Sequence, residues 1–110
     1  MMPMMWLAII AVLVAVTTLR RIHSGKRIRV FRARGAVVVD VRTSNEFRGG
    51  HAHGAVNMPL DQIAGLASKL DKSWPVLLCC ASGARSAVAA RMLREKGFDT
   101  FNAGSWTRLR

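Results

Sequence analysis

The sequence predicts an α/β fold, in which a mostly parallel sheet is flanked by helices and preceded by one transmembrane helix. Within residues 35–110, short apolar runs alternate with runs of helical spacing. Such alternation is typical of parallel strands joined by crossover helices. Residues 1–19 carry no charged side chain and are mostly apolar. As a helix they span about 28 Å, close to the hydrocarbon core of a bilayer, which is about 30 Å thick.

The apolar segment, residues 1–19, is predicted to be a retained single-pass membrane anchor with Trp6 at one interface. A cleaved signal peptide is the main alternative. Signal peptides normally begin with basic residues and end in a small-residue cleavage site, whereas here the basic residues follow the apolar run. A buried core helix is the third interpretation, and a domain of this size is too small to surround one.

A cluster of basic residues follows the apolar segment. The chain has a net charge of +11, and residues 20–34 contribute seven Lys or Arg side chains and no acid. Because cytoplasmic flanks are rich in Lys and Arg, this basic juxtamembrane segment predicts an inner (cytoplasmic) membrane protein whose domain faces the cytoplasm. Anionic lipid headgroups are the expected partner of the cluster. Nucleic acid is not expected, because Phe31 is the only aromatic residue among the basic ones.

The remaining elements are predicted in order along the chain. A first edge strand is expected at residues 28–31, and a strand covered on both faces at residues 37–41, where the apolar run is continuous. A third short strand is expected at residues 55–58. A helix capped by Asp61 should follow it, because apolar residues recur at i, i+3, i+4 and i+7, namely at Ile63, Leu66, Ala67 and Leu70.

The C-terminal part of the chain predicts two more strands and one longer helix. Residues 76–79 form an apolar run that favours a buried strand, and residues 100–102 predict the last strand. The helix between them is expected to begin near Ser86 and to end before Gly97, a residue suited to a helix C-terminus. Because the chain ends soon after Trp106, any final helix must be short.

Cys80 lies where the strand at residues 76–79 turns into this helix. In such a place backbone N–H groups and the helix dipole point at the sulfur, and both favour the nucleophilic thiolate. Gly83 permits a positive φ, and Arg85 is expected to add a cation beside the sulfur. Four residues separate Cys80 from Arg85, so the loop is compact enough to wrap one sulfur atom or a persulfide. The candidate site is loop 80–86, which consists of Cys80, Ala81, Ser82, Gly83, Ala84, Arg85 and Ser86.

Loop 80–86 resembles the active-site loop of single-domain rhodaneses, a family of sulfurtransferases that often carry C-x-x-G-x-R-S there. Residues 37–47 are similar to the family's D-V-R…E-F/Y segment, and residues 50–60 to its G-H-I-P-G-A-x-N-I-P-L segment. Residues 97–106 resemble its C-terminal end. The resemblance covers residues 35–110 in family order and implies a small rhodanese-like domain. At residues 52–53 Ala-His replaces the usual Ile-Pro, which predicts an altered turn.

The resemblance implies that the Cys80 thiolate takes sulfane sulfur from a donor and passes it to a thiophilic acceptor. The donor would be a small sulfur-donor anion such as thiosulfate, or a protein persulfide, and no cofactor is needed. Two alternatives stay open. One is a membrane-tethered sulfur-binding or sensing module without efficient turnover. The other is a cysteine phosphatase or arsenate reductase, although these enzymes place five residues between the cysteine and the arginine.

The second cysteine and the histidines are interpreted as structural. Cys79 should point into the core, because successive strand residues face opposite sides. Two adjacent cysteines give no disulfide framework and favour a reducing compartment; a vicinal disulfide is the alternative. His51 and His53 lack a third ligand at metal-site spacing, so no metal is expected.

Three further positions are predicted to shape the edge of the site. Asp40 and Arg42 are interpreted as a framework pair rather than as acid–base catalysts. Arg48 is expected to be a solvated surface charge. Trp106 is expected to cover the edge of the core or, as the alternative, to flank the mouth of the site.

Overall fold

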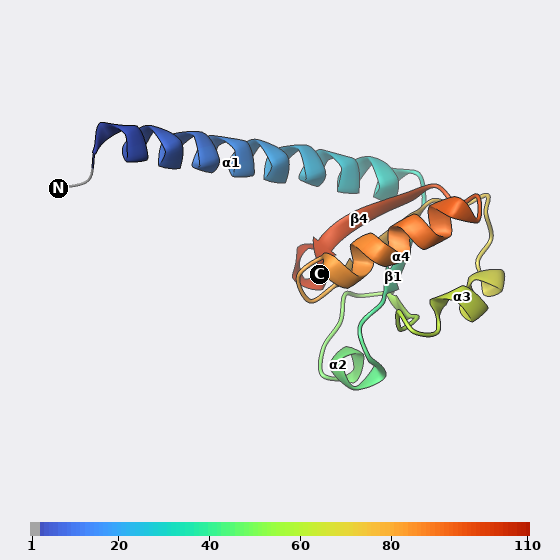
Figure 1. Cartoon of the computed structure of the whole chain (residues 1–110). Coiled ribbons are helices and arrows are strands. Elements are labelled where there is room, and N and C mark those ends of the chain that lie inside the picture. Colours follow the sequence, from blue (N-terminus) through green and yellow to red (C-terminus); the bar gives the residue numbers. More distant parts are fainter. Residues whose placement is uncertain (1–2) are drawn as a thin grey trace.

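The computed structural model describes residues 3–110 and consists of one long N-terminal helix and a small α/β domain (Figure 1). Helix α1 runs without interruption from Met4 to Ala33. It is long and apolar enough to cross a membrane, and its most apolar window is 0% buried within the chain, unlike the core helix of a soluble protein. A signal sequence near the N-terminus can also be long and apolar enough to meet this criterion. Residues 1 and 2 of the predicted anchor lie outside the described residues.

The C-terminal turns of α1 belong to the domain rather than to a linker. The strand expected at residues 28–31 is wrong, because these residues are helical and continue α1. Ile28 and Phe31 are three residues apart, so they lie on one face of the helix. There they are 6% and 1% exposed and pack in the core. This spacing fits one face of a helix, and the helix already formed upstream favours its continuation.

Four parallel strands form the sheet in the order β2-β1-β3-β4. They are β1 (Val37–Asp40), β2 (Val56–Asn57), β3 (Val76–Cys80) and β4 (Thr100–Ser105). This confirms the predicted parallel sheet. Because all the strands run the same way, their carboxyl ends meet at one edge, where Cys80 pairs with Ser105. This edge is called the carboxyl edge.

Helices cover both faces of the sheet, as predicted. On one face lie α4 (Ala84–Glu95), which begins two residues before the predicted Ser86, and the short pieces α3 (Ile63–Leu66) and η1 (Ala67–Lys69). The single helix expected after Asp61 is thus broken in two, and its cap is Gln62. The short final helix is confirmed as η2 (Trp106–Arg108).

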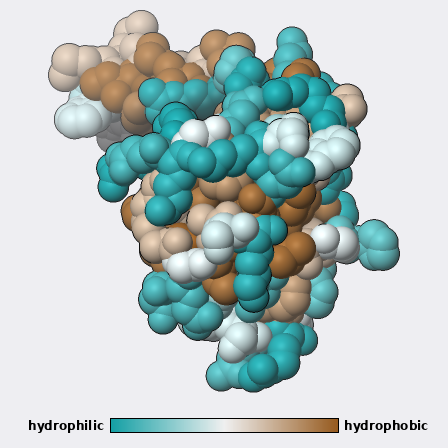
Figure 2. All heavy atoms as spheres, turned by 90° about the vertical axis from the view of Figure 1, so that its right-hand side faces the viewer, coloured by the Kyte–Doolittle hydropathy of each residue, from teal (hydrophilic) through white to brown (hydrophobic). Residues whose placement is uncertain are grey.

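The opposite face of the sheet is covered by α1. Phe31 packs against Phe101 of β4, with ring centroids 5.8 Å apart, and shares a buried cluster with Leu77 and Leu109. The apolar N-terminal part of α1 extends beyond the domain, and Figure 2 shows its hydrophobic residues gathered at the upper left. One helix therefore carries both the candidate membrane segment and part of the domain's core.

Candidate active site

Cys80 is the last residue of β3 and lies at the carboxyl edge, where the chain turns into α4. Cys80 is 1% exposed. The Sγ atom accepts a hydrogen bond from the Gly83 backbone N–H at 2.9 Å and another from the Ser86 hydroxyl at 3.3 Å. Loop 80–86 thus wraps the sulfur, as its sequence predicted, with Ser86 buried and the side chains of Ala81 and Ser82 exposed.

Gly83 is required by the backbone of the loop. It precedes α4 with a φ of 106°, in the left-handed region that favours glycine. A Cβ atom at this position would lie 3.1 Å from the Cα of Gly104 in the neighbouring strand. Any side chain here would therefore meet both backbone strain and a close contact, and the Gly83 N–H could no longer be held on the sulfur.

The pKa values of the two cysteines are shifted in opposite directions. Burial raises the pKa of Cys80, but hydrogen bonds from the Ser86 hydroxyl and from the backbone N–H groups of Ser86, Gly83 and Ser82 outweigh it and bring the pKa below its ordinary value of 9.0. Burial raises the pKa of Cys79 to about 12, with the Asp40 charge as a smaller cause. Cys79 faces the core beneath α1, as predicted. Both cysteines are free, so the vicinal disulfide is not formed.

Asn102 is a site residue that the sequence reasoning missed. Its Nδ2 donates to the Gly83 carbonyl at 2.9 Å, while its Oδ1 accepts from the Ser86 hydroxyl at 2.7 Å and from the Gly104 N–H at 3.0 Å. Asn102 therefore ties the loop to β4. The Ser86 hydroxyl has one proton, so it divides its donation between Asn102 and the sulfur. Asn102 is distant in sequence from the loop, and only the sheet register brings the two together.

The guanidinium of Arg85 is held by Glu46 rather than by the sulfur. Its Nη1 and Nη2 donate to the two carboxylate oxygens of Glu46 at 2.8 and 3.0 Å. This bidentate pair raises the pKa of Arg85. The same hydrogen bond lowers the pKa of Glu46 to about 2, with help from Thr43. Arg85 was expected beside the sulfur, and a pairing across 39 residues of sequence was not foreseen.

Glu46 is placed by a short helix that was also not foreseen. Helix α2 (Ser44–Arg48) begins with a capping box, in which Thr43 accepts from the Glu46 N–H and the Glu46 carboxylate accepts from the Thr43 N–H. The sequence carries the signal for this box, a threonine followed three residues later by a glutamate. Arg48 is exposed at the end of the helix, as predicted.

Asp40 and Arg42 form the predicted framework pair under the site. Their side chains are 0% and 6% exposed, and Arg42 Nη2 lies 2.8 Å from Asp40 Oδ2. Arg42 also donates to the carbonyls of Gly50 and Glu46 at 2.7 and 3.4 Å. Its guanidinium lies 4.7 Å from the ring centroid of Trp106. Trp106 is half-buried and packs on the core beneath α1, which confirms its position at the edge of the core.

A hollow of about 350 Å³ opens at the carboxyl edge beside Arg85. It is lined by Val41, Thr43, Pro59, Leu60, Asp61 and Arg85. Its walls are mainly apolar, and Arg85 supplies the cation among them. The hollow offers room for a small molecule next to loop 80–86.

The histidines do not converge on a metal site. The ring of His51 stacks on Phe47 with centroids 3.7 Å apart, and its Nδ1 lies 2.8 Å from the Phe47 carbonyl. His53 is exposed. Within residues 3–110, no group of three or more His, Cys, Asp or Glu side chains is arranged to hold a metal ion.

A parallel sheet that ends in a cysteine, with an amide-lined turn leading into a helix, defines a class of small α/β proteins with a cysteine loop. Comparison with known families is more specific. The family model of the rhodanese-like domain matches residues 23–108, and the chain belongs to this family. The match begins within α1, before the residues Ile28 and Phe31 that pack on the sheet.

Individual relatives agree with this assignment. The chain is 45% identical over 69 residues to the uncharacterized protein YqhL of Bacillus subtilis, covering 61% of this chain and 55% of that protein. It is 29% identical over 83 residues to the thiosulfate sulfurtransferase GlpE of Shewanella oneidensis, covering 76% and 82%. A rhodanese-like domain protein from Staphylococcus aureus has a similar crystal structure, with a TM-score of 0.62, 30% identity and coverage of 67% and 72%.

Proposed function

We propose that this protein is a membrane-anchored sulfurtransferase that carries sulfane sulfur as a persulfide on Cys80. The observation that carries the proposal is the set of hydrogen bonds on Cys80 Sγ from Gly83 and Ser86. Hydrogen-bond donors held about 3 Å from a developing negative charge stabilise it without reorganisation. They lower the pKa of Cys80, so the thiolate that attacks sulfur is favoured. The relation to GlpE, a thiosulfate sulfurtransferase, supports the same reaction.

The reaction has two halves. In the first, the Cys80 thiolate attacks the sulfane sulfur of thiosulfate; a new S–S bond forms, the S–S bond of thiosulfate breaks, and sulfite leaves with the electron pair. In the second, a thiophilic acceptor attacks the terminal sulfur of the persulfide, and the Cys80 thiolate leaves. Between the halves, the terminal sulfur carries negative charge that the N–H groups of loop 80–86 stabilise. Such a covalent intermediate predicts ping-pong kinetics.

Arg85 is proposed to guide the donor rather than to activate the sulfur. It lines the hollow beside loop 80–86 and is held by Glu46. Its side chain is 37% exposed, so its outer face is open to a donor anion that enters the hollow. Because Glu46 neutralises part of its charge, Arg85 orients the donor anion and adds little to its binding affinity.

The proposal also includes the membrane. Residues 1–19 are proposed as the anchor, residues 20–34 as a basic juxtamembrane segment and residues 35–110 as the rhodanese-like domain, facing the cytoplasm. The length and apolar composition of α1 support the anchor, and the seven basic residues that follow support the orientation. A reporter fused to the C-terminus tests it: activity of a reporter that works only in the periplasm would overturn this orientation.

Mass spectrometry tests the chemistry directly. The full chain, purified in detergent and treated with thiosulfate, should gain the mass of one sulfur atom on the peptide that contains Cys80. Cys80→Ser should abolish the gain. Cys79→Ser is the matched control, because Cys79 is 0% exposed and faces the core, and it should retain the gain. Sulfur loaded on Cys79 alone would contradict the proposal.

A further inference from the structure

We infer that the carboxyl edge of the domain, with the candidate active site on it, rests against the anionic headgroups of the bilayer that holds α1. The inference rests on the membrane anchor proposed above. The anchor alone would leave a domain free to tumble on a linker, with its site facing any direction. Here the direction is set by the structure, because α1 is one continuous helix from Met4 to Ala33 and is packed into the domain.

Contacts along α1 establish its direction relative to the sheet. Near the end of α1, Arg34 forms an ion pair with Asp99, which directly precedes β4. One to two turns earlier, Arg27 and Phe31 contact the ring of Phe101 at the start of β4. Helix α1 and strand β4 therefore run in opposite directions, and the carboxyl edge of the sheet points back toward the apolar half of α1.

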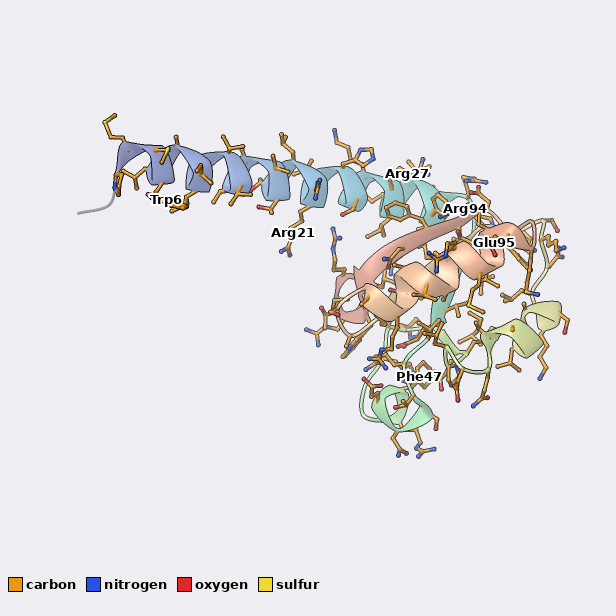
Figure 3. The ribbon with its side chains drawn as sticks, in the orientation of Figure 1. Trp6, Arg21, Arg27, Phe47, Arg94 and Glu95 are labelled. Atoms are coloured by element: carbon orange, nitrogen blue, oxygen red, sulfur yellow. The ribbon has the colours of Figure 1, made fainter. Side chains whose placement is uncertain are left out.

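The far end of β4 reaches the beginning of the basic segment. Arg108 of η2 donates to the Ser24 hydroxyl at 2.7 Å and to the Arg21 carbonyl at 3.2 Å. Figure 3 shows the Arg21 side chain beside this end of the domain, whereas Arg94 and Glu95 lie at the opposite end. The carboxyl edge is thus level with Arg21 and Ser24 along the axis of α1.

This level coincides with the headgroup layer. Arg21 follows Leu19, the last residue of the apolar segment, by two residues, or about 3 Å along a helix. The headgroup region on each side of the hydrocarbon core is about 5–8 Å thick. With Leu19 at the boundary of the core, the ends of β3 and β4 lie at headgroup depth. Loop 80–86 begins at the end of β3, so it lies at the same depth.

The residues at the carboxyl edge match an anionic surface. Residues 1–39, loop 80–86 and residues 100–110 contain no acid. At this edge the exposed or half-buried cations include Arg20, Arg21, Arg108 and Arg110, together with Arg85, which is paired with Glu46. Trp106 is half-buried there, with the Arg110 guanidinium 5.4 Å from its ring centroid. Tryptophan is enriched at membrane interfaces, and cations attract anionic lipids.

The six acids of the chain divide evenly between the two ends of the domain. Asp71, Glu95 and Asp99 all lie at the edge where the parallel strands begin, the end farthest from the apolar segment. At the carboxyl edge the acids are Asp40 and Glu46, each paired with an arginine, and Asp61. At the edge where the strands begin, Asp99 is paired with Arg34, and Lys72 and Lys96 lie near Asp71. The direction of α1, and not the distribution of charge, therefore sets which edge faces the lipid. Sulfur exchange at Cys80 therefore takes place at the membrane surface.

Depth measurements on the full chain test this orientation. Thr107→Cys places a fluorescent label at the carboxyl edge, and Glu95→Cys places the same label at the opposite end; both positions are exposed. Each is made in a Cys80→Ser background, with the buried Cys79 retained, so the readout is independent of sulfur chemistry. The proteins are reconstituted in vesicles of phosphatidylethanolamine and phosphatidylglycerol that contain a headgroup spin-labelled lipid as quencher. The two labels differ in depth by about 17–20 Å, from the length of β4 and the matching stretch of α1.

We expect quenching several-fold stronger at position 107 than at position 95. Arg110→Glu, which reverses one exposed charge at the carboxyl edge, should leave this difference between the two positions in place, because the packing of α1 sets the orientation. Equal quenching at both positions, or stronger quenching at position 95, would overturn the orientation while leaving the anchor intact. Failure of the chain to float with the vesicles would overturn the anchor and this inference together. Neither result depends on persulfide formation, which is measured separately by mass.

Discussion

At the scale of single residues, the acidity of Cys80 depends on which groups donate to its sulfur. The Ser86 hydroxyl and three backbone N–H groups lower the pKa against the opposing effect of burial. A thiol whose pKa is lowered in the folded protein contributes its full stabilisation above pH 9.0, its ordinary pKa. This contribution is lost as the pH falls through the pKa of the folded state. The thiolate population at neutral pH therefore depends on loop 80–86 remaining folded around the sulfur.

Removing the Ser86 hydroxyl should raise the pKa of Cys80 toward 9.0, because the largest favourable hydrogen bond is lost. The measurement is the pH titration of thiolate ultraviolet absorbance in Ser86→Ala. Ser82→Ala is the matched control, since Ser82 contributes its backbone N–H rather than its hydroxyl, and its titration should coincide with that of the unmodified chain. An unchanged titration in Ser86→Ala would show that the backbone N–H groups alone hold the thiolate.

Glu46 controls the charge that Arg85 presents to the hollow. Its pKa is lowered from 4.5 to about 2 by the Arg85 hydrogen bond, so the pair's contribution to stability is complete above pH 4.5 and is lost as the pH falls through about 2. Glu46→Gln leaves the guanidinium uncompensated at all pH values. We expect the KM for thiosulfate to fall several-fold with a smaller change in kcat. A higher KM would mean that Glu46 is needed to position Arg85 rather than to neutralise it.

At the scale of elements, α1 is both a candidate membrane segment and a layer of the domain. Phe31 is 1% exposed and packs on Phe101, whereas Val30 on the same helix is 49% exposed. Phe31→Ala should lower the free energy of unfolding by about 3–5 kcal/mol, as for other buried aromatic residues. Val30→Ala, the control, should change it by less than about 1 kcal/mol. Denaturant unfolding of the full chain in detergent compares the two.

The same element shows where sequence reasoning reached its limit. The strands at residues 37–41 and 76–79 were predictable, because apolar runs bounded by turn residues favour buried parallel strands. Residues 55–58 and 100–102 are shorter and more polar and carry a weaker signal. The run at residues 28–31 was predicted to be a strand, but Ile28 and Phe31, three residues apart, lie on one face only in a helix. Packing against Leu77 and Phe101 shows that this segment is the last part of a helix.

The site was predictable in its local part and not in its long-range part. The sulfur, Gly83 and Ser86 lie within seven consecutive residues, so the turn geometry alone brings them together. Asn102 reaches the loop through the sheet register, and Glu46 reaches it through α2. Both residues are too far from the loop in sequence for turn or helix spacing to predict the contact. The T-x-x-E capping box at Thr43 was the one local signal that pointed to Glu46.

At the scale of the whole molecule, the fixed attachment of α1 means that the charge of the lipid headgroups changes the local concentration of donor anion near Cys80. With the carboxyl edge at the headgroups, a donor anion must approach Cys80 through the potential of the membrane surface. An anionic leaflet has a potential of about −30 mV. A dianion such as thiosulfate is disfavoured there by about 1.4 kcal/mol, which lowers its local concentration about tenfold.

Persulfide formation by thiosulfate should therefore depend on the lipid. The rate of mass gain on Cys80 in the full chain should be up to about tenfold lower in phosphatidylglycerol-rich vesicles than in phosphatidylcholine vesicles. Added salt should remove the difference, because it screens the surface potential over about 10 Å at 0.1 M. Vesicles that contain a cationic lipid should reverse its sign. The lipid charge acts on the donor's concentration and not on the chemistry, so saturating thiosulfate should give the same rate in all three vesicles. Rates independent of lipid charge at low salt and low thiosulfate would place the site beyond the reach of the headgroups.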